Sequence, residues 1–260
     1  MRVCKMVAEV RQALAEARQG RKVGFVPTMG ALHRGHLSLV DTARQSCDYV
    51  VMSVFVNPIQ FNSPQDLLSY PRTLERDLDR AASVGVDLVF APTEKEIYSD
   101  MLHAQKEGPP RECRIAAGPT SRVLEGLHRP GHFDGVVTVV AILFNIVQPD
   151  IAVFGEKDFQ QVRVIQEMAR DLKFRVRILT GPIVRDTDGL ALSSRNELLS
   201  TEERRRALVI PRTLFAAQAM LAGGVRKSQA LIDFVTKEVG ESGGLKIDYV
   251  AVVNPTTLEP

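Results

Sequence analysis

The segment PTMGALHRGH, residues 27–36, holds two histidines three positions apart between an apolar run and a segment of helical periodicity. If a helix begins near His33, the imidazoles of His33 and His36 share one face at its N-terminus. Unpaired N–H groups and the helix dipole attract anions to that end, and Gly35 removes a side chain where a nucleotide has to approach. Two imidazoles placed there can hydrogen-bond to a departing pyrophosphate and protonate it.

His36 has an alternative role in the hydrophobic core, since it is in phase with Val40, Ala43 and Cys47 on the expected helix. The position of HxGH between a strand and a helix favours a catalytic role, because HxGH is a signature of nucleotidyltransferases that attack the α-phosphate of a nucleoside triphosphate. A metal site on the same pair is disfavoured, since no third Cys, His or carboxylate stands at a suitable spacing. We therefore expect phosphate chemistry without a metal held by protein ligands.

Amide side chains follow the next apolar run. The segment FVNPIQF, residues 55–61, turns out of the expected sheet and places Asn57 and Gln60 where uncharged donors and acceptors can hold a small hydroxy acid. A polar turn without a ligand is the alternative. Arg129 and His132 stand in RPGHF just before an apolar helix and combine a cation with an imidazole. By themselves these two residues indicate only a loop.

A second segment repeats the order of strand, glycine turn and helix: FGEKDFQQ, residues 154–161. Lys157 at the start of that helix would face the same crevice as the HxGH segment, where its compact charge suits a phosphate. The alternative is a solvated surface pair of Lys157 and Asp158. The order of elements therefore predicts a second phosphate-binding turn.

The segment LSSRN, residues 192–196, supplies two hydroxyl groups and one guanidinium, which suit the β- and γ-phosphates of a nucleotide. Alone, it is also compatible with a simple helix cap at Ser194 or Asn196. The preceding DTDG, residues 186–189, resembles the start of a calcium loop, but LSSRN stands where the later ligands should be, so we predict a tight turn. The chain has neither GxxxxGK[ST] nor GxGxxG after a strand, so the competing phosphate motifs are absent.

Five apolar runs alternate with segments of helical periodicity, which is typical of parallel strands buried on both faces. The predicted strands are Val23–Pro27, Tyr49–Val56, Val86–Phe90, Ile151–Phe154 and Phe174–Leu179. Between the second and third strands, the spacing of Leu74, Leu78 and Ala81 predicts a crossover helix that ends at Gly85. The predicted fold class is α/β with a Rossmann-like parallel sheet, and such sheets bind ligands at the carboxyl ends of their strands.

The run GVVTVVAILFNIVQ, residues 135–148, is apolar on nearly all sides, so as a helix it should be buried, inside the chain or at a subunit contact. A strand is the alternative for this run. After Leu179 come turn formers, a charged helix start and a strand-like KIDYVAVV, residues 246–253. We expect a domain boundary near Gly181, with a nucleotide-binding domain over residues 1–180 and a smaller α+β domain over residues 181–260.

The charge balance argues against a polyanionic partner, since 33 Lys and Arg residues against 31 Asp and Glu residues leave a formal charge of +2. We therefore expect no nucleic acid and no membrane surface as a partner. No run approaches the roughly 18 apolar residues of a membrane span, and the N-terminus has no signal-peptide core. Cys4, Cys47 and Cys113 form no CxxC pair and suit a reducing compartment, so the expected location is the cytoplasm.

Taken together, PTMGALHxGH, FVNPxQF, YPR, LEGxxRPGHFxGV, FGEKDFQQ and LSSRN resemble the pantothenate synthetase family in order and spacing. The similarity runs from about Gly24 to Asn196 and continues more loosely to Pro260. The resemblance implies a ligase of pantothenate and coenzyme A biosynthesis that condenses (R)-pantoate with β-alanine. It implies cleavage of ATP to AMP and pyrophosphate, with Mg²⁺ present, through an enzyme-bound pantoyl adenylate. It also implies a homodimer and a hinged C-terminal lid domain.

The resemblance also implies roles for individual residues. The expected proton donor to pyrophosphate is His36, and His33, Lys157 and Arg195 would assist it. The implied ATP-binding residues are Met29, Gly30, Ala31, Leu32, His33, Arg34, Gly35, His36, Gly155, Glu156, Lys157, Asp158, Val184, Leu192, Ser193, Ser194 and Arg195. The implied substrate-binding residues are Gln60, Gln161, Asn57, Arg129 and His132. Val184 would lie near adenine, and Gln60 would also face β-alanine.

Family members usually continue beyond Pro260 with another helix and a short strand, so the resemblance implies an abbreviated C-terminal domain or an incomplete sequence. A nucleotidyltransferase that keeps its nucleotide on the product, or a tRNA-charging relative, is a competing class. Both are disfavoured by the near-neutral charge and by SSRN in place of a lysine-rich KMSKS-type loop. A nucleotide-sensing module with a degenerate site is the non-enzymatic alternative, and it is disfavoured because every expected polar position is filled.

Overall fold

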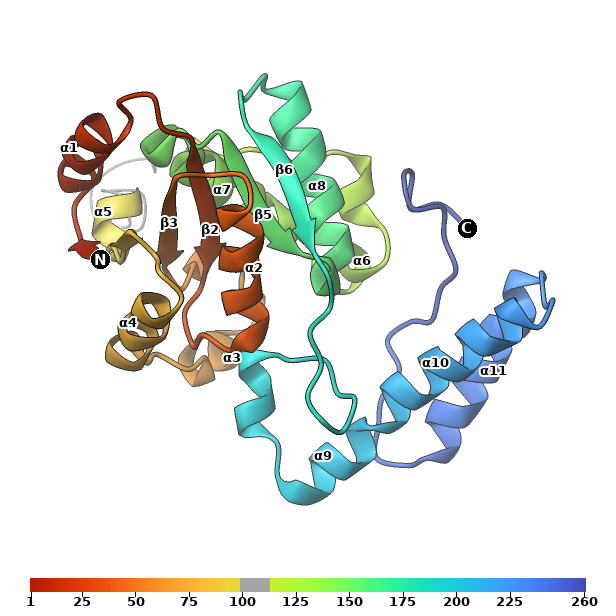
Figure 1. The fold of residues 1–260 in the computed structure, drawn as a ribbon. Coiled ribbons are helices and arrows are strands. Elements are labelled where there is room, and N and C mark those ends of the chain that lie inside the picture. The colour runs from red at the N-terminus through yellow and green to blue at the C-terminus, as the bar shows by residue number, and fades with distance from the viewer. Residues whose placement is uncertain (99–112) are drawn as a thin grey trace, which may run out of the picture. The chain divides into compact units, whose positions relative to one another are not determined.

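The computed structural model describes residues 1–98 and 113–260, and the chain forms two compact units, Met1–Pro182 and Ile183–Pro260 (Figure 1). The first unit holds the parallel sheet and all the motifs from HxGH to FGEKDFQQ. The second unit begins just after the last strand and carries LSSRN. Each unit has its own hydrophobic core.

The first unit is built around a sheet of six parallel strands in the order β1-β4-β3-β2-β5-β6. The strands are β1 (Arg2–Cys4), β2 (Val23–Thr28), β3 (Tyr49–Val54), β4 (Leu88–Phe90), β5 (Ile151–Gly155) and β6 (Arg177–Gly181). The predicted α/β class and the five predicted strands are confirmed, with strand ends that shift by up to three residues. Strand β1 was not predicted, because three residues are too few to show a readable alternation.

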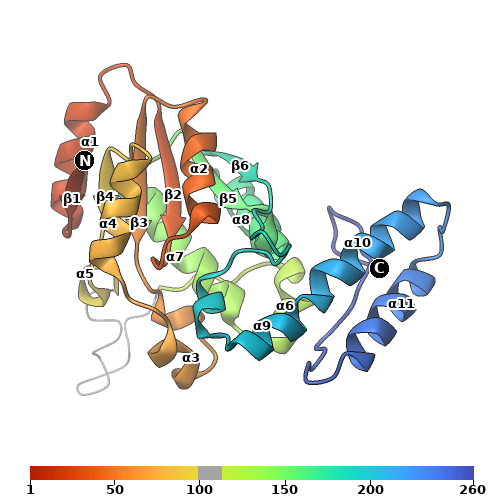
Figure 2. The same ribbon diagram turned by 60° about the horizontal axis from the view of Figure 1, so that its bottom comes forward.

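Helices cover both faces of this sheet (Figure 2). The helices of the first unit are α1 (Val7–Ala17), α2 (Arg34–Arg44), α3 (Pro64–Ser69), α4 (Leu74–Ser83), α5 (Glu94–Tyr98), α6 (Glu125–His128), α7 (His132–Val147) and α8 (Phe159–Asp171). Its short 3-10 turns are η1 (Pro58–Gln60), η3 (Pro119–Arg122) and η4 (Glu156–Asp158). Phe25 and Ala152 pack in the core with α1, α7 and α8, whereas the next residues, Val26 and Val153, pack in the core with α2 and α4. Both faces of the four central strands, β4, β3, β2 and β5, are buried, which explains their continuous apolar runs.

The apolar run at residues 135–148 belongs to helix α7, in which 13 of 16 residues are buried. A helix was one of the two interpretations of this run, and burial against α1, α8 and the sheet explains why it is apolar on nearly all sides. Within residues 1–98 and 113–260, no helix combines the length and the hydropathy needed to cross a membrane.

The strand order reverses between β2 and β5. From β2 the chain continues outward through β3 and β4, whereas β5 and β6 extend the sheet on the other side of β2. Because all strands are parallel, the turns that follow β2 and β5 leave the same edge of the sheet next to each other. Open α/β sheets bind their ligands at this kind of switch point. The topology therefore brings the HxGH segment beside the FGEKDFQQ segment.

The second unit contains the 3-10 turn η5 (Ser194–Leu198) and the helices α9 (Thr201–Ala207), α10 (Val209–Ala222) and α11 (Ser228–Glu241). Val209, Val235 and Val239 form its small core. The strand expected at residues 246–253 is wrong, because this segment has no strand in the structure. A single strand needs a neighbouring strand for its backbone hydrogen bonds, and the only β-pairing in residues 183–260 is the isolated bridge between Arg185 and Ala191.

Candidate active site

The loop between β2 and α2 has an unusual backbone. Gly30 has φ +81° and Ala31 has φ +48°, so two successive residues lie in the left-handed region. A Cβ at position 30 would stand 3.0 Å from both an Asp77 carboxylate oxygen and a Val54 methyl carbon, so the close contacts and the backbone angle both favour glycine. The non-glycine residue Ala31 costs about 1 kcal/mol or more in this conformation, which persists only where surrounding contacts hold it.

His33 is the N-cap of α2, as the sequence predicted, and His36 stands in the first turn of that helix. The backbone N–H of Gly35 donates to Nδ1 of His33 at 3.1 Å, and the backbone N–H of His33 donates to Nδ1 of His36 at 3.3 Å. The two rings stack with centroids 4.0 Å apart. Because each Nδ1 accepts a hydrogen bond, each neutral imidazole carries its proton on Nε2.

Burial is the main cause that lowers the pKa of His36 to about 3, and the nearby His33 and Lys157 contribute in the same direction. His36 is therefore neutral near pH 7. A neutral imidazole with its proton on Nε2 is a hydrogen-bond donor that carries no charge of its own. This electrostatic state favours donation of a hydrogen bond to a phosphate oxygen over delivery of a proton from an imidazolium.

Side chains of helix α4 hydrogen-bond to the backbone of this loop. The Asp77 carboxylate accepts the backbone N–H of Ala31 at 2.9 Å and that of Leu32 at 2.7 Å, and Arg80 donates to the carbonyl oxygen of Leu32. Asp77 is only 1% exposed. The strained backbone of the loop is thus supported by side chains from a helix that follows it by more than 40 residues.

The amide groups of FVNPIQF form a buried network. Asn57 donates through Nδ2 to Oε1 of Gln60 at 2.9 Å and to the carbonyl oxygen of Gly135 at 3.1 Å. The Tyr98 hydroxyl donates to Oδ1 of Asn57, so the whole Asn57 amide group is occupied. Nε2 of Gln60 lies 3.4 Å from the sulfur of Met29 in the HxGH loop. These bonds fix the orientation of the Gln60 amide next to that loop.

Arg129 and His132 support the backbone of Gln60. Nδ1 of His132 donates to the carbonyl oxygen of Gln60 at 2.7 Å, and Arg129 donates to the same oxygen at 3.3 Å. Burial lowers the pKa of His132, so this imidazole also stays neutral near pH 7. Gly135 permits the close approach of helix α7 to the backbone of Ile59 and Gln60, because a Cβ there would stand 2.5 Å from the Ile59 carbonyl oxygen.

The turn after β5 is more open. Lys157 pairs with Asp158 at 3.2 Å, and the side chains are 39% and 60% exposed. Of the two glutamines at the start of α8, Gln160 is buried and bonds to the carbonyl oxygens of Thr120 and Val123. Gln161 is only partly buried. The Gln160 amide is therefore used within the chain, whereas the Gln161 side chain remains partly exposed.

In the second unit, a hairpin precedes LSSRN. Leu192 donates its backbone N–H to the carbonyl oxygen of Val184 at 3.0 Å, and the predicted tight turn at DTDG closes with a bond from Gly189 to Asp186 at 2.9 Å. Ser193 is the cap of η5 and accepts the backbone N–H of Arg195 at 3.3 Å. Residues 183–196 thus form an ordered local structure.

Comparison with known proteins decides the family. The family model for pantoate-beta-alanine ligase matches residues 2–260. The chain belongs to the pantoate–β-alanine ligase family. It is 47% identical to pantothenate synthetase from Pseudomonas fluorescens, over all of this chain and 88% of that protein. A second relative, pantothenate synthetase from Moorella thermoacetica, is 48% identical and is covered over 89% of its length.

Solved structures of the pantoate–β-alanine ligase family have the same fold. The crystal structure of pantothenate synthetase from Thermus thermophilus superposes with a TM-score of 0.91 at 46% identity, covering 100% of this chain and 90% of that one. Pantoate–β-alanine ligase from Francisella tularensis, complexed with beta-gamma ATP and β-alanine, has a TM-score of 0.85 at 35% identity, covering 98% and 90% of the two chains.

The pantoate–β-alanine ligase motifs of the first unit fall into two groups at the carboxyl edge of the sheet. Met29 to His36 and Gln60 come together directly through the Met29–Gln60 contact. Gly155 to Asp158 and Gln161 follow the neighbouring strand β5. Arg129 and His132 lie behind Gln60. Val184 and Leu192 to Arg195 belong to the second unit.

Sequence reasoning missed two residues of this pantoate–β-alanine ligase site, Asp77 and Tyr98. A signal for Asp77 was available, since it follows Leu74 by three positions and so lies in phase with the predicted buried face of its helix. No comparable signal existed for Tyr98, whose bond to Asn57 joins two distant segments. Among the described residues, no cluster of three or more His, Cys, Asp or Glu side chains could hold a metal ion.

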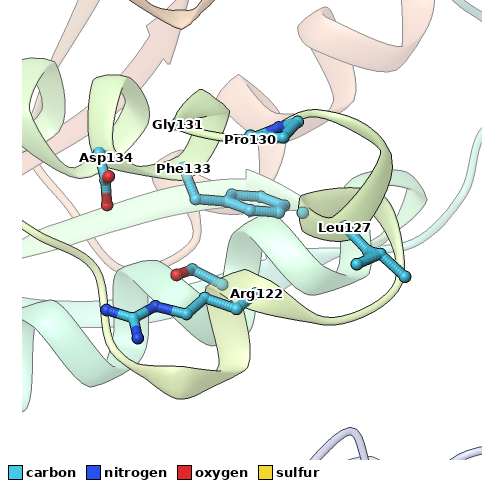
Figure 3. Close-up of a pocket in the computed structure, with 8 residues that line it drawn as sticks. Arg122, Leu127, Pro130, Gly131, Phe133 and Asp134 are labelled. Atoms are coloured by element: carbon cyan, nitrogen blue, oxygen red, sulfur yellow. The ribbon is translucent and has the colours of Figure 1, made fainter.

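A cavity of about 300 Å³ lies between η3, α6 and the start of α7 (Figure 3). Arg122, Leu127, Phe133 and Asp134 are among the residues that line it. Asp134 also accepts the backbone N–H of Ala117 at 2.8 Å. None of the site residues predicted from the sequence lines this cavity.

Proposed function

We propose that this chain condenses pantoate with β-alanine to form pantothenate and cleaves ATP to AMP and pyrophosphate through a pantoyl adenylate. Membership of the pantoate–β-alanine ligase family supports an ATP-dependent ligase that forms the pantothenate amide bond. The Francisella tularensis relative complexed with beta-gamma ATP and β-alanine supports two of the three substrates. The observation that carries the proposal is the stacked pair of imidazoles at the switch point of the sheet, each with its Nδ1 facing a backbone N–H.

In the first step, the pantoate carboxylate attacks the α-phosphorus of ATP, and negative charge builds on the phosphate oxygens and the leaving pyrophosphate. Donors that already point at these oxygens stabilise that charge, and each is worth about 3 kcal/mol. His33 and His36 donate through Nε2, and Lys157 contributes a positive charge. His36 acts as a neutral hydrogen-bond donor, because with a pKa of about 3 its imidazolium form, which could transfer a proton, is absent near pH 7.

The remaining ATP contacts come from two turns. Met29 to His36 and Gly155 to Asp158 line the nucleotide, and the hairpin of the second unit supplies Val184 near adenine and Leu192 to Arg195 for the phosphates. In this proposal the second unit acts as a lid that excludes water from the hydrolysable adenylate.

Magnesium arrives with ATP. Mg²⁺ commonly combines one or two carboxylates with substrate phosphates and retained waters. The Asp158 carboxylate fits this role, because its side chain is 60% exposed and, within residues 1–98 and 113–260, only Lys157 is in salt-bridge contact with it. When bound, the ion neutralises charge on the phosphates.

Pantoate is held by Gln60 and Gln161, and Gln60 also faces β-alanine. We assign Asn57, Arg129 and His132 to support of Gln60 instead of direct contact with substrate, because their polar groups already bond to that residue. The assignment of Gln161 predicts that Gln161→Ala raises the KM for pantoate far more than the KM for ATP. Gln160→Ala is the matched control, and it should lower the melting temperature while leaving the ratio of the two KM values unchanged.

The test is a product assay with ATP, pantoate and β-alanine. Equal amounts of AMP, pyrophosphate and pantothenate are expected. Without β-alanine, one pyrophosphate per active site should be released and the adenylate should stay bound. A product that retains the nucleotide, with no free AMP, would instead identify a nucleotidyltransferase, and binding of ATP without any product would identify a sensing module.

We further propose a cytoplasmic homodimer. Three cysteines without disulfide partners suit a reducing compartment. The dimer rests on the family resemblance, and light scattering coupled to size-exclusion chromatography tests it directly. A mass of one chain at micromolar concentration would contradict it.

A further inference from the structure

We propose that Asp77 and Arg80 of helix α4 are positioning residues for adenylate formation, because they hold the backbone that orients the two imidazoles. Neither residue belongs to the sequence motifs of the site. Their hydrogen bonds to the loop go to backbone groups of Ala31 and Leu32 and not to a histidine side chain. The inference rests on the proposed function, since it concerns the first half-reaction of that ligase.

Asp77 holds two successive N–H groups. Its Oδ1 accepts the N–H of Leu32 at 2.7 Å, and its Oδ2 accepts the N–H of Ala31 at 2.9 Å and the hydroxyl of Thr73 at 3.2 Å. Both oxygens of a side chain that is 1% exposed are therefore used. A carboxylate accepts at both oxygens, whereas an amide would bring an NH₂ group against a backbone N–H.

Arg80 holds the next peptide group. Its guanidinium donates to the carbonyl oxygen of Leu32, and the N–H of the same peptide belongs to His33 and donates to Nδ1 of His36 at 3.3 Å. One peptide plane is thus fixed at its oxygen by Arg80 and at its nitrogen by His36. Rotation of this plane would remove the bond that keeps the proton of His36 on Nε2.

The arrangement fits a positioning role better than a role in stability alone. A buried carboxylate is costly, and apolar packing of the same volume is often equally stable. Among the described residues, the hydrogen bonds of the Asp77 side chain go to Ala31 and Leu32 of the loop and to Thr73 at the start of its own helix. The loop backbone is in the left-handed region at Gly30 and Ala31, so it needs such support to keep one conformation.

The experiment compares two half-reactions in the full-length protein. Adenylate formation is measured as single-turnover pyrophosphate release from ATP and pantoate. Amide formation is measured as the reaction of β-alanine with pantoyl adenylate supplied to the enzyme. The variants are Asp77→Asn, which keeps the shape of the side chain, and Arg80→Met, which keeps the apolar stem. Thermal melting is recorded on the same preparations.

The matched control is Asp87→Asn. Asp87 also accepts a backbone N–H, that of Val50 at 2.7 Å, and pairs with Arg44 at 2.6 Å. Val50 stands near the start of β3, at the end of the sheet away from the candidate site. This variant removes a comparable carboxylate bond and should lower the melting temperature while pyrophosphate release stays within about twofold of wild type.

We expect Asp77→Asn to slow pyrophosphate release at least tenfold and Arg80→Met to slow it at least threefold, while β-alanine attack on supplied adenylate changes less than threefold. Pyrophosphate release at the wild-type rate per folded molecule would overturn the inference. Equal losses in both half-reactions would also overturn it, since they indicate general damage. If Asp77→Asn does not fold, Arg80→Met decides by the same criteria. Failure of the wild-type protein to release pyrophosphate would instead overturn the proposed function itself.

Discussion

Two turns of the first unit follow neighbouring strands at the same edge of the sheet, yet they are built differently. The loop after β2 is held by buried bonds from Asp77 and Arg80 and contains two left-handed residues. The turn after β5 is open, and its Lys157 and Asp158 side chains are 39% and 60% exposed. In the proposed mechanism, the first turn therefore presents fixed donors, whereas the second presents a cation that can follow a phosphate as it moves.

The largest effect is expected at the rigid turn. His36→Ala should slow adenylate formation by about 100-fold or more, in line with loss of a donor worth about 3 kcal/mol in the barrier. Single-turnover pyrophosphate release and thermal melting on one preparation measure the effect. His128→Ala is the control, because His128 is exposed on α6 and outside the proposed site. A His36 variant that melts early but turns over normally per folded molecule would make His36 a core residue.

The open turn should tolerate change better. Lys157→Met should slow adenylate formation about 30-fold through loss of a charge at the phosphates. Lys157→Arg should recover most of that rate, because an exposed side chain in an open turn has room to place a larger cation. Rates from the same pyrophosphate assay test both variants. If Lys157→Arg does not recover activity, the turn after β5 requires as exact a side-chain geometry as the loop after β2.

The glycines of the two turns give a matched pair for stability. Gly30→Ala should lower the free energy of unfolding by about 1–3 kcal/mol, because φ is +81° and the new Cβ would meet Asp77 and Val54. Gly155→Ala should change it by less than about 0.5 kcal/mol, since φ is −83° and no atom lies within 4 Å of the new Cβ. Urea unfolding measures both, and equal losses would contradict the contrast.

The buried His36 also predicts a dependence of stability on pH. The pKa of His36 is about 3 in the folded protein and near 6.5 in the unfolded chain, so below pH 6.5 the unfolded chain binds a proton that the folded protein does not. Stability should therefore fall as pH drops from about 6.5 toward 3, with no contribution from His36 above 6.5. Urea unfolding between pH 5 and 7 should show a flatter profile for His36→Gln than for wild type. Parallel profiles would contradict the low pKa.

Much of the fold was readable because its signals are local. Four of the five predicted strands, those that became β2, β3, β4 and β5, are short apolar runs, and burial on both faces makes such runs stand out. The strand expected at residues 246–253 was wrong because strand formation does not depend on local signals alone. Its apolar alternation is a local property, but a strand also needs a partner, and the described residues of the second unit provide none for it.

The candidate site was predicted only in part. His33, His36, Gln60 and Lys157 could be proposed from the sequence because each stands in a motif that follows a strand. Asn57, Arg129 and His132 were expected around the substrate, and the structure shows that their polar groups bond to Gln60. Spacing along the chain indicates which residues gather at one edge of a sheet, but it does not tell which of them touches a ligand and which supports a neighbour.

The sequence by itself determined the family, the parallel α/β class and the order of the motifs at the carboxyl edge, since these depend on residue types at short spacings. The tertiary structure decided the chemical state of the site. The Nε2 protons of the two histidines depend on backbone bonds within the loop, and the loop depends on Asp77, which is 46 positions from Ala31. A hydrogen bond across that separation has no periodicity along the chain, so only the folded geometry reveals it.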